Sequence, residues 1–217
     1  MFWDDWTTYA PDLLQGLGVS AQLIGIALAI GLPLGLVLAM FANSRTAIVR
    51  SSIVVLVEIG RGVPALVMLQ ILYFGLPSSG ITLDALIAGG LALGLTTAAY
   101  SSEIIRGGLQ AVPFGEIEAA QAMAMSRAHI LRYIVVPQGL RICLPPLLGF
   151  CIAMFQATSL AYTISVPELL GSAYSIGSST FRYLSILVLA GLFYAAITVP
   201  ASLLVNSMES RLGKHQR

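Results

Sequence analysis

The stretch LQGLGVSAQLIGIALAIGLPLGLVLAMF, residues 14–41, decides the fold class of this chain. It carries no charged side chain, and none occurs between Asp12 and Arg45. A helix needs about 20 mostly apolar residues to cross the hydrocarbon core of a bilayer, so this stretch can span it even when tilted. Of the 217 residues 57% are hydrophobic and only 10% are charged, against roughly a quarter in soluble domains. The sequence therefore predicts an all-α integral membrane protein.

Four further apolar stretches extend this to five transmembrane helices in a single domain that covers residues 1–217. The predicted spans are residues 14–41, 53–76, 84–105, 142–162 and 183–208. Prolines inside the spans are tolerated in a membrane, because neighbouring helices can satisfy the freed backbone groups. Two pairs of glycines at a spacing of four residues, Gly31 with Gly35 and Gly90 with Gly94, are typical of close packing between helices.

Basic residues predict how the spans are oriented, because arginine and lysine near span ends stay on the cytoplasmic side. They gather after the first, third and last spans, at Arg45, Arg50, Arg106, Arg127, Arg132, Arg141, Arg211, Lys214 and Arg217. The segments that face the other side contain one basic residue, Arg182. We therefore expect the N-terminus outside and the C-terminus in the cytoplasm.

The cytoplasmic connection between the third and fourth spans, residues 107–141, is longer than an ordinary loop. Pro113 and Gly115 break the chain, and Glu116 and Glu118 then place negative charge in the first turn of a predicted helix. Good helix formers continue to residue 132. The pattern predicts a short helix at the membrane surface with Glu118 available to a partner; the alternative is a linker helix that rests on lipid headgroups.

Residues 113–120, Pro-Phe-Gly-Glu-Ile-Glu-Ala-Ala, and residues 134–137, Ile-Val-Val-Pro, resemble the cytoplasmic EAA loop of bacterial ABC importer permeases. In that family the loop forms a coupling helix that docks into a groove on the ATP-hydrolysing subunit. The resemblance implies a type I importer fold with its coupling loop at residues 113–137. It places ATPase coupling on Gly115, Glu116, Glu118, Ala119, Ala120 and Ala124. The chain departs from the motif at Ala124, where glycine is usual, and at Val136, where leucine is expected.

Four further segments, in order, are similar to the polar amino acid branch of these permeases, typified by histidine, glutamine, arginine and glutamate-aspartate importers. They are residues 58–64, 100–108, 158–160 and 167–170. The resemblance implies a permease subunit in the bacterial cytoplasmic membrane that translocates polar amino acids or related zwitterions. Glutamate or aspartate, glutamine, basic amino acids and compatible solutes such as ectoines all remain open as substrates.

The same resemblance implies a set of partners. A second permease subunit, identical or homologous, completes the pathway, and two ATPase subunits bind ATP and Mg. An extracytoplasmic binding protein delivers the substrate, and residues 167–181 help to cap the path on the outer face; the alternative for this segment is a surface loop. Homodimer and heterodimer both remain open.

Other functions find little support in the residues. The chain has no Walker-type sequence, because the glycine-containing stretch at residues 171–178 lacks a lysine, so we expect neither ATPase activity nor a cofactor in this chain. His129 and His215 are isolated, which argues against a metal site. The alternative of a secondary transporter or channel driven by an ion gradient would need an inverted repeat or a row of acidic residues, and neither is evident.

Ionisable residues inside a span are costly and are therefore candidates for function, which singles out Glu58 and Arg61 in the second span. Gly62 and Pro64 follow directly and suggest a broken helix near the midplane, where an arginine could bind a carboxylate. The alternative is that Glu58 and Arg61, three residues apart, only neutralise each other. Neutral hydrogen bonds to the substrate, or to neighbouring helices instead, are predicted for Gln156, Thr158 and Ser159.

Overall fold

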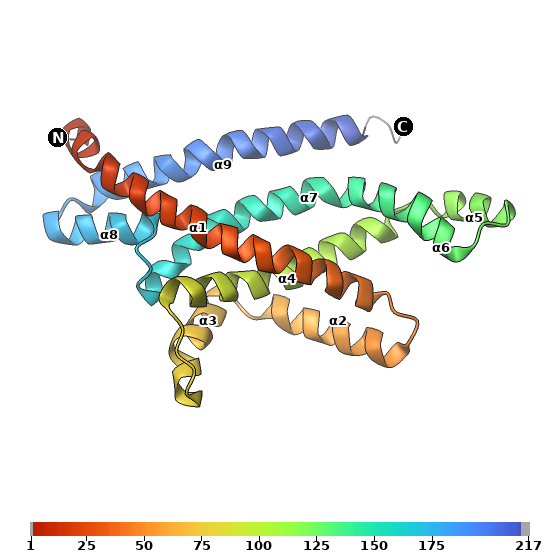
Figure 1. The fold of residues 1–217 in the computed structure, drawn as a ribbon. Helices are drawn as coiled ribbons and strands as arrows, with labels where there is room; N and C mark the ends of the chain where they lie inside the picture. The colour runs from red at the N-terminus through yellow and green to blue at the C-terminus, as the bar shows by residue number, and fades with distance from the viewer. Residues whose placement is uncertain (1, 214–217) are drawn as a thin grey trace.

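The computed structural model describes residues 2–213, and within that range the chain folds into helices and turns without a strand, which confirms the all-α prediction (Figure 1). Lys214, His215 and Arg217 lie outside the described residues. The helices are, in chain order, α1 (Phe2–Ala42), α2 (Ala47–Gly62), α3 (Ala65–Gln70), η1 (Ile71–Gly75), η2 (Leu76–Ser79), α4 (Ala85–Gln110), α5 (Phe114–Ala122), α6 (Arg127–Ile130), η3 (Leu131–Val135), α7 (Val136–Ala157), η4 (Thr158–Ile164), α8 (Leu169–Thr180) and α9 (Tyr183–Gly213).

The second predicted span, residues 53–76, is interrupted between Gly62 and Ala65. α2 and the segment formed by α3, η1 and η2 meet at an angle of 94°. Pro64 has no amide hydrogen and disfavours helical backbone in the residue before it, and Val63 is accordingly extended, with ψ of 122°. The break suggested by Gly62 and Pro64 is therefore present.

Four long helical segments are apolar enough to cross a membrane, and the bent pair makes up to five among the described residues. The helices continue past the predicted spans: α1 begins at Phe2 and α9 reaches Gly213, and a helical run from Arg127 leads into the fourth span. A hydrophobic window detects only the part of a helix inside the hydrocarbon core, whereas the helix itself can extend into the polar interface.

α1 and α4 pack closely along their length, and glycine makes this contact possible. A Cβ added to Gly31 would lie 2.7 Å from the carbonyl oxygen of Gly94, and one added to Gly90 would lie 2.5 Å from Ile26. A Cβ on Gly35 would overlap the hydroxyl of Ser101. The pair Gly31 and Gly35 on α1 thus faces α4, and the pair Gly90 and Gly94 on α4 faces α1. This is the close helix packing that the spacing predicted.

Buried apolar residues form two main clusters. The inner cluster joins α1, α3, α4, α7 and η4 and includes Leu23, Leu69, Leu93 and Ile164. The outer cluster joins the N-terminal half of α1 to α8 and α9 and includes Leu13, Leu169, Ala173, Ile186 and Leu189. The fold therefore has a central core around α4 and a second core at the end that carries α8.

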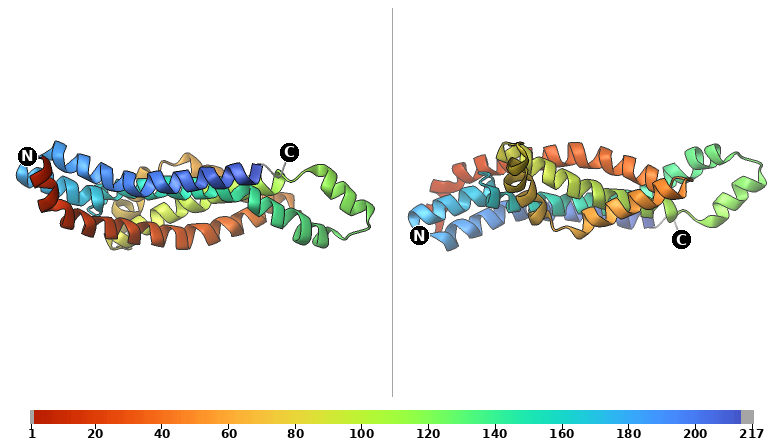
Figure 2. Two further views of the ribbon diagram at one scale, coloured as in Figure 1. Left: turned by 90° about the horizontal axis from the view of Figure 1, so that it is seen from above. Right: turned by 90° about the horizontal axis from the view of Figure 1, so that it is seen from below.

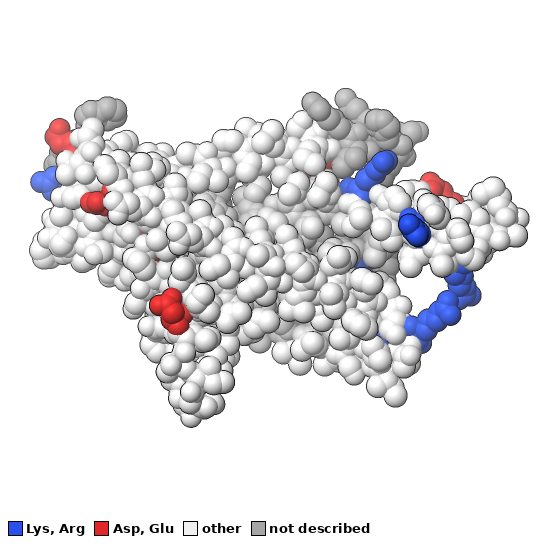
Figure 3. Space-filling model, viewed as in Figure 1, with Lys and Arg blue, Asp and Glu red and all other residues white. Residues whose placement is uncertain are grey.

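The molecule is elongated, and its two ends differ (Figure 2). One end carries the N-terminus and α8, and from the other α5 and α6 project beyond the bundle. On the face shown in Figure 3, a broad uncharged band separates these ends, and most of the visible arginine and lysine atoms lie near the end with α5 and α6. This distribution follows the positive-inside pattern used to predict orientation.

Candidate functional site

The projecting helix α5 presents a mostly exposed surface at one end of the molecule. Glu118 and Ala119 are exposed and Ala120 is buried, so the helix turns one side outward and the other toward the bundle. Glu116 lies in the first turn and accepts a hydrogen bond from the side chain of Gln138 in α7. Gly115 is exposed as well. Of the predicted coupling residues, Glu118 is therefore the one whose charge is exposed and, within residues 2–213, makes no hydrogen bond or ion pair with the bundle.

Two large apolar side chains at the ends of α5 were not singled out by the sequence. Phe114 is 68% exposed and Met123 is 71% exposed, although both lie outside the predicted spans. Aromatic residues and methionine are enriched in protein interfaces. Large apolar side chains that stay exposed to water can mark a surface that binds a partner. For Phe114, the sequence signal that could have identified it is its position two residues before the first-turn Glu116.

α5 is shorter than the run of helix formers suggested, because it ends at Ala122 and not near residue 132. Ala124 has a left-handed backbone with φ of 55°. The amide of Met125 donates to the carbonyl of Ala120 at 3.1 Å and the amide of Ala124 donates to the carbonyl of Gln121 at 2.9 Å, which is the Schellman arrangement. Glycine is preferred at the left-handed position, so Ala124 accepts strain to close the helix there.

Glu58 and Arg61 form an ion pair on α2, with 3.0 Å between Oε1 and Nη1. The Glu58 side chain is 60% exposed and that of Arg61 is 32% exposed. Tyr100 of α4 lies against Arg61: its hydroxyl donates to the Arg61 carbonyl at 3.1 Å, and the guanidinium lies 5.7 Å from its ring centroid. The Nε of Arg61 is buried and has no hydrogen-bond partner within residues 2–213. The mutual pair is thus present, and it leaves the buried Nε donor unused.

A second charged pair, Glu103 with Arg106, lies near the C-terminal end of α4. Nε of Arg106 donates to the Glu103 carboxylate at 2.9 Å, and the guanidinium also bonds to the Gln110 side chain at 3.3 Å. Both members are satisfied within one helix. This pair has the geometry of a structural ion pair.

η4 has one buried edge and an exposed polar side. Thr158, Ala161 and Ile164 are buried at the three-residue repeat of a 3₁₀ helix. The hydroxyl of Thr158 donates to the carbonyl of Phe155 at 2.7 Å. This residue, which the sequence predicted to bind substrate, is therefore buried, and its hydroxyl hydrogen already forms a hydrogen bond within the helix. Gln156 is exposed and Ser159 is half-buried, on the side that faces away from that edge.

Gln70, which the sequence did not single out, extends this polar side onto the segment after the helix break. Its Nε2 donates to the hydroxyl oxygen of Thr163 at 3.0 Å, and Thr163 is exposed. We define the polar face as Gln70, Gln156, Ser159 and Thr163. Polar side chains at membrane depth are costly against lipid and usually face a cavity, a water-filled path or another protein.

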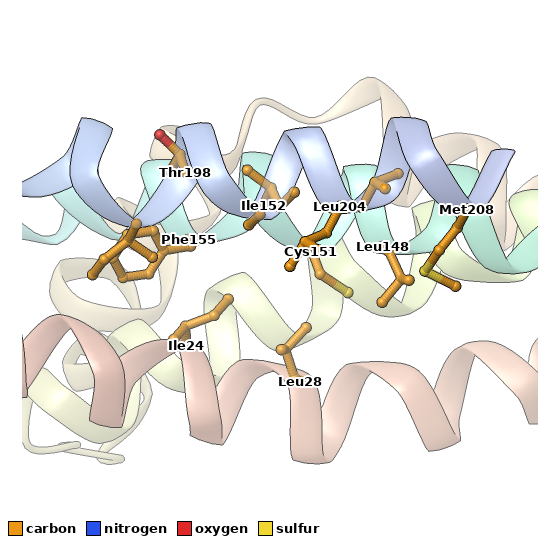
Figure 4. A pocket seen from close by; sticks show the side chains of 12 residues that line it. Ile24, Leu28, Leu148, Cys151, Ile152, Phe155, Thr198, Leu204 and Met208 are labelled. Atoms are coloured by element: carbon orange, nitrogen blue, oxygen red, sulfur yellow. The ribbon is translucent and has the colours of Figure 1, made fainter. Parts of the chain in front are cut away.

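An apolar groove of about 400 Å³ lies between α1, α7 and α9 (Figure 4). Ile24 and Leu28 line it from α1, opposite Leu148, Ile152 and Leu204 on the other two helices. Thr198 at its edge donates its hydroxyl to the carbonyl of Tyr194 at 2.9 Å, so it offers no free donor. This groove suits hydrocarbon and cannot solvate a charged amino acid, which favours the polar face for a polar substrate.

Known proteins resemble this chain along almost its whole length. Residues 31–214 match the family described as binding-protein-dependent transport system inner membrane component. YckA of Bacillus subtilis (strain 168), a probable amino-acid ABC transporter permease protein, is 36% identical over 201 residues, covering 93% of this chain and 89% of the relative. The octopine transport system permease protein OccM of Rhizobium radiobacter is 34% identical over 221 residues, covering 98% and 90%.

A solved structure shares the fold closely. The crystal structure described as an amino acid ABC transporter with histidines contains a chain that superposes with a TM-score of 0.91 at 32% sequence identity. The superposition covers 95% of this chain and 97% of the other. The overall arrangement of helices therefore belongs to an architecture already seen in an amino acid ABC transporter.

Proposed function

This chain belongs to the family of binding-protein-dependent transport system inner membrane components, and from that premise we propose that it carries polar amino acids or related zwitterions into the cell. It is a permease subunit of an ABC importer, a multi-pass protein of the bacterial cytoplasmic membrane. It is a transport subunit and not an enzyme; ATP hydrolysis belongs to a separate subunit. Compatible solutes such as ectoine stay within the proposed substrate class, because they too are zwitterions.

The projecting helix α5 carries this proposal. It lies beyond the bundle, exposes Glu118 and Ala119, and has Phe114 exposed at its start. An apolar anchor next to a charge, on a short rigid helix, is the kind of element that docks into a groove of a partner. In our proposal α5 docks on one of two ATPase subunits, which bind ATP and Mg between them.

The polar face is the proposed route for substrate. The side-chain amides of Gln70 and Gln156 offer neutral donors and acceptors that can match a carboxylate and an ammonium. The hydroxyl of Ser159 donates to the carbonyl of Gln156 at 2.8 Å, so it offers an acceptor oxygen. Arg61 lies on α2, which approaches the break from the cytoplasmic side, and its Nη1 can bind a carboxylate when Glu58 moves aside. A second permease subunit, identical or homologous, would cover this face and complete the path, and an extracytoplasmic binding protein would deliver the substrate.

Reversing one charge tests the docking of α5. The complete transporter is reconstituted in vesicles with its binding protein, and substrate-stimulated ATP hydrolysis is measured. We expect Glu118→Lys to abolish the stimulation while the permease remains in the membrane. Glu209→Lys is the matched control, because Glu209 is also exposed but lies near the end of α9. Unchanged stimulation in the Glu118 variant would refute the role assigned to α5.

A further inference from the structure

Glu168, just before α8, is completely buried although it lies outside the predicted spans. Its carboxylate accepts hydrogen bonds from the amides of Leu170 at 3.0 Å and Gly171 at 2.7 Å. It also accepts from the hydroxyls of Tyr194 at 2.9 Å and Ser20 at 3.3 Å. Burial raises the pKa of this carboxyl above its ordinary value, and the four donors oppose that shift. A buried carboxylate persists only where such donors compensate its lost hydration.

These donors come from three different helices. The two amides open α8, Tyr194 lies in α9, and Ser20 lies in α1. The hydroxyl oxygen of Ser20 in turn accepts from the amide of Leu169 at 3.1 Å, so α1 holds the start of α8 by two bonds. Glu168 is therefore more than a helix cap, because it ties α8 both to α1, which is remote in sequence, and to the helix that follows, α9.

Backbone packing strengthens the same junction. A Cβ added to Gly16 of α1 would lie 2.6 Å from the hydroxyl oxygen of Ser172 and 3.0 Å from the carbonyl oxygen of Glu168. The outer apolar cluster, with Leu13, Leu169 and Ile186, joins α1, α8 and α9 a turn away. Polar bonds, close backbone contact and apolar burial thus connect the same three helices.

The junction also marks the boundary between the two apolar clusters. On α1, Ser20 lies between Leu17, which packs on the outer cluster, and Leu23 of the inner cluster. Where the chain enters α8, Val166 belongs to the inner cluster and Leu169, the first residue of α8, belongs to the outer one, with Glu168 between them. The polar network therefore separates a central core from an outer body made of α8 and the outer parts of α1 and α9.

We propose that Glu168 is a positioning residue that fastens α8 to α1 and α9, so that these helices move as one body during transport. α8 is flanked by left-handed residues, Ser165 with φ of 65° and Phe181 with φ of 58°, which could otherwise let it swing as a separate lid. The network prevents this motion. The path then opens on the outer side by movement of the segment that follows the break at Pro64, which comprises α3, η1 and η2. This inference rests on the proposed function, since it states which part moves during import.

A disulfide between α1 and α8 tests the proposal directly. Gly16→Cys and Ser172→Cys are combined in a transporter that also carries Cys143→Ala and Cys151→Ala. The two Cβ positions are 3.0 Å apart, so a shift of about 0.5 Å reaches the usual disulfide range. We expect the bond to form and uptake by the oxidised transporter to stay within about twofold of the reduced one. A loss of about tenfold or more, restored by reductant, would overturn the proposal, and so would thiols that do not pair.

Oxidised and reduced forms are compared in one preparation, so this result is separable from the proposed function. If the reduced transporter takes up no amino acid or zwitterion, the proposed function fails. If it does, only the disulfide decides whether α8 moves independently.

Substitution at the junction gives an independent measurement. With Glu168→Gln, only one acceptor oxygen faces four donors, and with Tyr194→Phe one bond is lost. We expect both variants to assemble and to hydrolyse about fivefold more ATP for each substrate imported, because α8 is no longer held. Asp84→Asn is the control, since Asp84 caps α4 by accepting from the amide of Leu86 within its own helix. A wild-type ratio of hydrolysis to uptake in the Glu168 and Tyr194 variants would contradict the proposal, because a merely structural role changes the amount of transporter and not this ratio.

Discussion

The side-chain amide of Gln70 donates to the hydroxyl of Thr163 at 3.0 Å, across 93 residues of sequence. The bond joins the segment that follows the break in the second span to the 3₁₀ helix that ends the fourth. Both side chains belong to the polar face, where a zwitterion could replace the bond between them with bonds of its own. The broken helix thus brings Gln70 onto the polar face. The apolar groove has no comparable side chain that could bind a polar substrate.

Removing the Gln70 amide should weaken substrate handling. In Gln70→Ala we expect the KM for uptake to rise roughly tenfold, because a lost hydrogen bond to a polar ligand costs about 1–3 kcal/mol. The concentration dependence of uptake in vesicles measures this change. Gln22→Ala, at an exposed glutamine of α1, is the control and should leave KM unchanged. Equal behaviour of the two variants would remove Gln70 from the path.

Phe114 should be an anchor for the ATPase subunit. Truncation of a central aromatic anchor typically costs about 2 kcal/mol or more, so Phe114→Ala should weaken association by about 30-fold. Titration of detergent-solubilised permease with labelled ATPase subunit gives the affinity. Phe181→Ala is the matched control, because Phe181 is 86% exposed but lies after α8 at the opposite end. Association that survives in the Phe114 variant would count against an apolar anchor on α5.

The left-handed backbone of Ala124 predicts a gain in stability from glycine. Ala124→Gly should stabilise the folded loop by about 1 kcal/mol, since glycine adopts this conformation without the Cβ penalty. Ala122→Gly, two residues earlier and still in α5, should cost about 0.5–1 kcal/mol. Hydrogen exchange of the α5 amides in the assembled transporter compares the two variants. Changes of the same sign would show that the backbone at Ala124 is unstrained.

Close packing of α1 on α4 should make Gly31 intolerant of a side chain. The added methyl group of Gly31→Ala would meet both Thr97 and the backbone of Gly94, so we expect a loss of about 1–3 kcal/mol. A Cβ at Gly25 of the same helix meets no atom within 4 Å, which makes Gly25→Ala the control. Thermal denaturation in detergent measures the difference, and matching midpoints would argue against this helix contact.

Much of the fold follows from sequence because the bilayer imposes strong rules. The uncharged run at residues 14–41 requires a spanning helix, and Pro64 after Gly62 breaks the next one for a local steric reason. The negative charges at Glu116 and Glu118 mark a helix start that the structure places within two residues, at Phe114. Each of these features is set by residues that are close together in the sequence, so the sequence alone can predict it.

Other features could not be predicted because they depend on contacts between distant residues. Nothing near Gln70 in the sequence indicates that it meets Thr163, and Ser20 gives no sign of the carboxylate of Glu168. Thr158 illustrates the opposite case: its hydroxyl was a candidate for the path, but the three-residue repeat of η4 turns it inward. The precise faces of helices follow from packing, which a single sequence does not specify.

The most direct test of the account is a photocrosslink from α5. Phe114→benzoylphenylalanine is introduced into the permease, the active transporter is reconstituted with its ATPase subunit and binding protein, and the adducts formed on illumination are identified by mass spectrometry. The account predicts an adduct with the nucleotide-hydrolysing subunit, and none with it from the same probe at Phe181. Adducts with lipid alone from position 114, in a preparation that imports substrate, would contradict the claim that α5 is the coupling element.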